Sequence, residues 1–208
     1  MEIINYGSFN PFGSQVKKNK IVIMHTSREV ESYLTSLKYR HNGKYDKIPN
    51  YVITKNGSIL KLLDDSGFGN FFYNDILNRN CIFIALENLG WLEKNNDLDI
   101  NLNWVGDIYK GQPYYKNWRD YDFWDHYTKE QLSSLGVLCN KICDDKKINK
   151  KFIGHNTRTN IDYKYNGIIT RANVLDTYTD ISPAFNIKLF EKNLENEKQQ
   201  LWWDERFA

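Results

Sequence analysis

The sequence predicts a single α/β domain with a mixed central β-sheet flanked by helices. Unbroken apolar runs at 20–25 and 81–88 indicate buried strands, and segments with helical periodicity separate such runs. A hairpin pattern at 50–63 adds antiparallel strands, so a purely parallel sheet is not expected. The length of 208 residues suits one domain.

The elements of the N-terminal half follow from local patterns. Residues 1–19 have no clean period, and we expect an irregular lead-in before the strand at 20–25. Thr26 and Glu29 have the spacing of a capping box and predict the start of a helix. Apolar residues then recur at helical spacing: Val30, Tyr33, Leu34 and Leu37. In the hairpin, Asn56-Gly57 supplies the turn, because both residues tolerate positive φ.

The C-terminal half holds an aromatic-rich insertion at 92–125, with no clean period. Thr128 and Gln131 form a second capping-box pattern and predict the next helix. The run at 151–155 is expected to be a short strand and 156–182 to be mostly irregular. The chain closes with a charged helical segment, for which we expect the bounds 184–208.

Composition excludes several classes of protein. The chain has 28 basic and 26 acidic residues, a balance that does not indicate a nucleic-acid binder. It has no apolar stretch of ~18 residues, so no membrane insertion is expected. The three cysteines form no disulfide pattern, and the N-terminus does not resemble a signal peptide. We therefore expect a soluble protein made in a cytoplasm. We also expect it to be a monomer.

Two apolar runs, "IVIMH" and "FIGH", each end on a histidine, His25 and His155. A lone histidine in such a place is more often structural. If both strands lie in one sheet with matching ends, however, the two imidazoles and one carboxylate form a zinc site with an open position for water. Asp180 is the best candidate carboxylate, because it precedes Pro183 in a segment that returns to the core. Other carboxylates remain possible: Asp162, Asp176 and Glu87.

The chain resembles the type-2 zinc N-acetylmuramoyl-L-alanine amidases, a family shared by phage endolysins, bacterial wall-recycling amidases and peptidoglycan recognition proteins. The resemblance rests on "IVIMHTS", "NYVITKNGSILKLLDD", "IFIALEN", "YTKEQLSSLGVLCNKI", "FIGHNTR" and "YTDISPAF", in that order over residues 20–190. It implies Zn²⁺ bound by His25, His155 and Asp180, and hydrolysis of the amide between the muramic acid lactyl group and L-alanine of peptidoglycan. It also implies a phage-type endolysin that stays in the host cytoplasm until it is released to the cell wall.

The sequence departs from this family around the metal. Pro49 and Tyr178 stand where members commonly have Tyr and Lys, and Ala85 stands where the acidic residue often falls. Glu87 shares a strand face with Ala85, so it is our candidate for the general base. Tyr178 is a candidate oxyanion donor. These changes keep an alternative open, namely a non-catalytic module of the same fold that binds muropeptides.

Two further sets of residues stand outside the proposed metal site. An aromatic cluster could line a glycan groove, although packing of the insertion onto the domain is the simpler interpretation: Trp104, Tyr114, Trp118 and Trp124. His41 and His126 are expected to be surface residues without a metal role.

Overall fold

The computed structural model describes residues 3–7, 16–154 and 164–195. Its core is a six-stranded sheet with the order β1-β4-β3-β5-β2-β10, and the sheet is mixed, as the sequence predicted. Only the β3–β4 pair is antiparallel. The strands are β1 (Ile3–Asn5), β2 (Lys20–His25), β3 (Tyr51–Ile53), β4 (Ile59–Lys61), β5 (Cys81–Leu86) and β10 (Gly167–Thr170).

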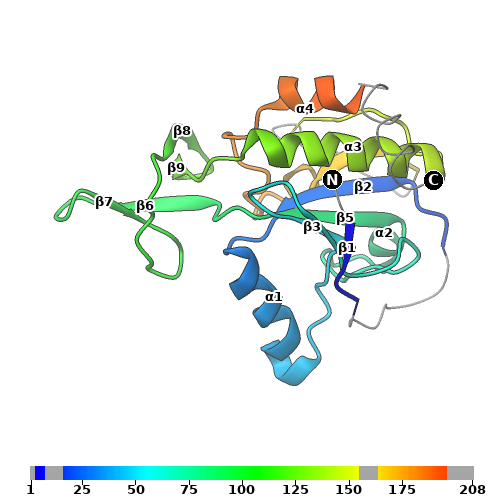
Figure 1. The fold of residues 1–208 in the computed structure, drawn as a ribbon, viewed down its shortest axis with the longest axis horizontal. Coiled ribbons are helices and arrows are strands. Elements are labelled where there is room, and N and C mark those ends of the chain that lie inside the picture. The colour runs from blue at the N-terminus through cyan, green and yellow to red at the C-terminus, as the bar shows by residue number, and fades with distance from the viewer. Residues whose placement is uncertain (1–2, 8–15, 155–163, 196–208) are drawn as a thin grey trace.

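Helices cover both faces of this sheet. In Figure 1, α3 (Lys129–Lys146) and α4 (Ile187–Leu194) lie on one side and α1 (Val30–Tyr39) on the other. Alternation along β2 explains both layers, because Ile21 and Ile23 join the cluster beneath α3, whereas Val22 and Met24 join the cluster beneath α1. The short helices are α2 (Asp75–Arg79) and two 3-10 turns, η1 (Arg40–Gly43) and η2 (Arg171–Asn173). No helix in the described ranges is long and apolar enough to span a membrane.

The strongest local signals are confirmed. β3 and β4 form the expected hairpin, and Gly57 in its turn has a φ of +85°. A Cβ at Gly57 would lie 3.0 Å from the Glu130 carbonyl oxygen, so the turn packs tightly against the start of α3. Thr128 and Gln131 form the predicted capping box at that helix start.

Two expectations for the N-terminal half are wrong. Part of the expected lead-in is strand β1, which pairs in parallel with β4. The capping box of Thr26 and Glu29 does not form, since Glu29 itself is the N-cap residue and makes no side-chain cap. The Thr26 hydroxyl instead donates to the Arg28 carbonyl at 2.5 Å and accepts from the Asn88 amide at 3.2 Å.

The segment before Asp180 also differs from expectation. Residues 151–154 form no strand, and Phe152 makes only an isolated bridge to Ile168. The strand that extends the sheet beyond β2 is β10, within the segment that we expected to be irregular. All four of its residues are buried, and β10 packs beside β2, whose residues are also all buried. The C-terminal segment is helical over α4, and residues 196–208 lie outside the described ranges.

The insertion is an ordered second sheet, an arrangement that we did not predict. It has the antiparallel order β7-β6-β9-β8 and projects away from the core in Figure 1. Its aromatic residues differ in exposure: Trp124 is fully buried and packs against Trp118, while Trp104 and Tyr114 stay partly exposed. The strands are β6 (Trp91–Asn95), β7 (Ile100–Leu102), β8 (Tyr114–Trp118) and β9 (Tyr121–Trp124).

Candidate active site

His25 lies at the last position of β2 and is almost fully buried. Its Nδ1 atom has no hydrogen-bond partner among the described residues. Burial lowers the pKa of His25 to about 4, so the ring is neutral near pH 7, which is the form that binds metals. Gly90 packs against the ring, since a Cβ there would lie 2.9 Å from the His25 Cε1 atom.

Asp180 is fully buried in the segment that follows η2. Its Oδ2 atom accepts a hydrogen bond from Nε of Arg171 at 2.6 Å. Its Oδ1 atom has no hydrogen-bond partner among the residues that the structure describes. The charge of Asp180 opposes the lowering of the His25 pKa by burial, so the two side chains lie within electrostatic reach of each other.

These two side chains fit a zinc ion in their chemistry. A neutral imidazole nitrogen and a carboxylate oxygen, both buried and unpartnered within the described ranges, are ordinary zinc ligands. His155 lies outside the described residues, as does the alternative carboxylate Asp162. Among the described residues, no group of three or more His, Cys, Asp or Glu side chains could hold a metal. Asp176 is largely exposed and pairs with Arg119 at 3.7 Å.

Glu87, the candidate base, lies one residue beyond β5 and is buried. Each of its carboxylate oxygens accepts one backbone hydrogen bond, Oε1 from Val30 at 2.9 Å and Oε2 from Lys55 at 2.7 Å. These bonds join the start of α1 and the hairpin turn to the end of the central strand. Burial, followed by a hydrogen bond to Glu87, raises the pKa of Glu29. The negative charge of Glu87 beside it raises the pKa of Glu29 further.

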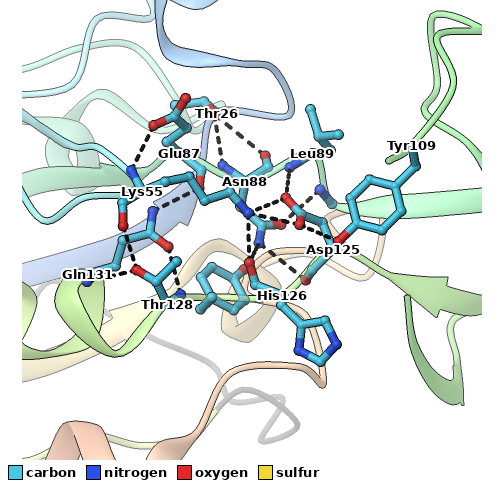
Figure 2. A network of polar contacts seen from close by, with 12 residues as sticks. Thr26, Lys55, Glu87, Asn88, Leu89, Tyr109, Asp125, His126, Thr128 and Gln131 are labelled. Carbon is cyan, nitrogen blue, oxygen red and sulfur yellow. Dashed lines mark hydrogen bonds and ion pairs between the residues drawn. The ribbon is translucent and has the colours of Figure 1, made fainter. Parts of the chain in front are cut away.

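A polar network beside Glu87 was not predicted from the sequence. Figure 2 shows Lys55 and Tyr109 directed at Asp125, whose side chain is only 3% exposed. Asp125 accepts from Lys55 Nζ at 2.7 Å, from the Tyr109 hydroxyl at 3.0 Å and from the Leu89 amide at 2.9 Å. Asn88 donates to the Asp125 carbonyl at 3.2 Å. The network therefore joins the hairpin turn, the end of β5 and the end of the insertion.

A cavity of about 450 Å³ opens between this network and the insertion. Charged groups of both signs line it, and it reaches the segment between β2 and α1, because Glu29 is one of its lining residues. Its lining residues are Glu29, Lys55, Leu89, Asn103, Asp107, Ile108, Tyr109, Lys110, Gly111 and Asp125.

The insertion also reaches the segment that carries Asp180. Arg119, in the β8–β9 turn, donates to the carbonyls of Ala172 at 3.2 Å, Asp176 at 2.8 Å and Tyr178. The Tyr178 hydroxyl donates to the Phe71 carbonyl at 2.7 Å, and burial raises its pKa. Sequence signals did not single out Arg119, because its partners lie more than fifty residues away along the chain.

His41 and His126 lie at the surface, whereas Ala85, one of the departures from the family pattern, lies in the core. His41 and His126 are exposed, with edge contacts to Tyr45 and Tyr114. Ala85 is fully buried in the cluster beneath α1, so no polar group stands at that strand position.

Solved amidase structures share this fold. AmiD from E. coli, in complex with a muropeptide substrate, has 15% identity and a TM-score of 0.55; the match covers 89% of this chain and 60% of that chain. The amidase LysC from Clostridium intestinale has 14% identity and a TM-score of 0.53, with 93% and 97% covered. The hydrolase AmiA from Staphylococcus aureus has 7% identity and a TM-score of 0.54, with 99% and 86% covered. Curated protein sequences gave no match.

A family model described as N-acetylmuramoyl-L-alanine amidase matches residues 14–166. The matched range contains His25, Glu87 and His155, whereas Tyr178 and Asp180 lie beyond it. Since the match covers well over half of the sequence, the chain belongs to the N-acetylmuramoyl-L-alanine amidase family.

Proposed function

We propose that this protein is a zinc-dependent N-acetylmuramoyl-L-alanine amidase that hydrolyses the bond between the lactyl group of muramic acid and L-alanine in peptidoglycan. One observation carries the proposal within a chain of this family. His25 and Asp180, which come from distant parts of the sequence, are both buried, and each keeps one potential ligand atom without a partner among the described residues. Buried polar atoms are nearly always paired, so these two atoms, in a chain of this family, support the proposal of a bound metal.

In this proposal His25, Asp180 and His155 hold the zinc ion. When bound, zinc polarises the scissile carbonyl and lowers the pKa of a coordinated water towards ~7. The protein contributes a neutral imidazole, a carboxylate fixed by Arg171 and a setting that excludes bulk water from both.

Glu87 is proposed to accept a proton from the attacking water and to return it to the leaving amine. Each of its oxygens keeps a lone pair beyond the backbone bond that it accepts, and the neighbouring Glu29 offers a second site for the proton. Tyr178 remains the proposed oxyanion donor. Its hydroxyl would first have to exchange its bond to the Phe71 carbonyl for a bond to substrate.

The test is release of new L-alanine amino groups from purified peptidoglycan. The wild-type chain is stripped of metal with a chelator and assayed before and after zinc is restored, and we expect activity only with zinc. His25→Ala and Asp180→Ala should each lose activity and bound zinc. His41→Ala is the matched control, since His41 is exposed and distant in sequence from both. Zinc-independent release, or full activity in Asp180→Ala, would contradict the proposal.

A second function, binding of muropeptide without cleavage, is favoured by the burial of Ala85 at the position where members often carry an acid. Calorimetry with a soluble muropeptide distinguishes the two functions. Binding by the zinc-loaded chain without any release of amino groups would favour the binding module.

The biological setting is also a proposal. A phage-type endolysin that is released from the host cytoplasm to the wall, and acts as a monomer, accords with the family and with the resemblance in sequence. Lysis of bacteria by protein added from outside, and the mass in solution from light scattering, test these two points.

A further inference from the structure

Among the described residues, Arg171 and Asp180 form the closest contact between opposite charges beside the candidate metal ligands. Nε of Arg171 donates to Oδ2 of Asp180 at 2.6 Å, and the two side chains are 14% and 1% exposed. The contact engages only one carboxylate oxygen, which leaves Oδ1 without a partner among the described residues. A guanidinium that binds one oxygen therefore leaves the other available to a different cation.

Arg171 is held in place from several sides. Its guanidinium lies over the Tyr178 ring at 4.5 Å from the centroid and near the Phe71 ring at 5.8 Å. The Tyr178 hydroxyl donates to the Phe71 carbonyl, so in the substrate-free chain the two rings form a frame around the guanidinium. The backbone completes the frame, since the Ala172 amide donates to the Asp180 carbonyl at 3.1 Å. Arg171 thus has little freedom to leave Asp180 when a metal arrives.

We infer that Arg171 is the counter-ion of Asp180. It neutralises this carboxylate in the metal-free chain and leaves Oδ1 as the one oxygen for a metal. The inference rests on the proposed function for its metal-binding half. Arg171 acts through Asp180, so it is a positioning residue.

Two opposite consequences follow from this arrangement. Without a metal, loss of Arg171 leaves a buried, unpaired carboxylate, which strongly destabilises a fold. With a metal, the fixed guanidinium repels the dication across a few ångströms of poorly solvated protein. The chain therefore keeps its site folded while empty and binds zinc less tightly than the ligands alone would allow.

The first test uses the full chain stripped of metal. The stability of Arg171→Met, Asp180→Asn and the double variant is measured by chemical denaturation in a double-mutant cycle. We expect both single variants to lower the denaturation midpoint and the double variant to lose much less than the sum of the two. Additive losses would overturn the counter-ion role. Arg79→Met is the matched control, because Arg79 also lies over an aromatic ring, at 5.8 Å from the Phe68 centroid, but is exposed.

The second test measures zinc affinity by competition with a chromophoric chelator. Arg171→Met should bind zinc at least about tenfold more tightly than wild type, because the repulsion is gone. The zinc affinity of Arg171→Lys should stay close to that of wild type. Arg171→Gln keeps a hydrogen-bond donor without the charge, and its zinc affinity should rise as in Arg171→Met. The Gln variant therefore keeps the test valid if Arg171→Met folds poorly. Unchanged or weaker binding in the uncharged variants would refute the inference. If wild type takes up no zinc, the proposed function fails, and the metal-free cycle alone decides whether Arg171 is the counter-ion.

Discussion

Replacement of Asp125 by alanine tests whether the polar network holds the insertion against the core. Asp125 connects the hairpin turn through Lys55, the end of β5 through Leu89 and the insertion through Tyr109. Its carboxylate is almost fully buried, so water cannot easily replace the lost acceptor. Alanine removes all three bonds and leaves Lys55 without its carboxylate partner.

The expected loss is worked from each partner. An unsatisfied buried amide at Leu89 costs about 1–3 kcal/mol. Breaking a buried ion pair costs about 3–5 kcal/mol. Lys55 is 32% exposed and keeps its bond to the His126 carbonyl, so we expect about half of this cost. Tyr109 can turn to water and adds little. The total is about 2.5–5.5 kcal/mol, or roughly 5–20 °C in Tm for a chain of this size.

The assay is urea denaturation followed by circular dichroism, in parallel with a thermal scan. Asp125→Asn keeps an acceptor oxygen and should lose about half as much as alanine. The control is Asp64→Ala, whose side chain is 77% exposed and paired only with Lys61 at the surface, with a loss below about 1 kcal/mol. Wild-type stability in Asp125→Ala would refute the reasoning that the network is an anchor.

Three further predictions concern groups inside the core. The His25 pKa of about 4 lies below its value in the unfolded chain, so the unfolded chain binds the extra proton. The metal-free protein should therefore lose stability as pH falls from about 6.5 to 4. The loss should reach up to about 1.4 kcal/mol per pH unit. Denaturation at several pH values should show this slope flattened in His25→Gln but not in His41→Gln. Gly90→Ala should lower Tm and weaken zinc binding, since φ is +81° and the new Cβ meets the His25 ring. All three thiols should resist a thiol reagent at pH 8 until denaturant is added, because burial raises the pKa of Cys81 and of Cys143 to about 12.

The features that the sequence predicted correctly depend on neighbours within a few positions. Asn56-Gly57 determines its turn by backbone preference, and Thr128 needs only Gln131 three residues later to cap α3. The buried strands β2 and β5 follow from continuous apolar runs, because both of their faces are covered by helices.

The features that were missed depend on partners far along the chain. The Thr26 hydroxyl is occupied by Asn88, which lies 62 residues away, so the expected capping box cannot form. β8 has an almost wholly exposed pattern, and without a buried face it shows no alternation in the sequence. The pairing of Arg171 with Asp180 depends on the loop between them, and no local motif indicates it. For the candidate site, the sequence therefore suggested ligands but not the charges that surround them.

The insertion touches the site region at three separate points. It starts beside Gly90 against His25, it ends at Asp125, and its β8–β9 turn holds the Asp180 segment through Arg119. It therefore does not behave as a removable appendage, even though it projects from the core in Figure 1. Slow hydrogen exchange should extend from the central strands into the loop that Arg119 binds. Replacement of residues 92–125 by a short linker should make both this loop and the candidate ligands His25 and Asp180 more mobile.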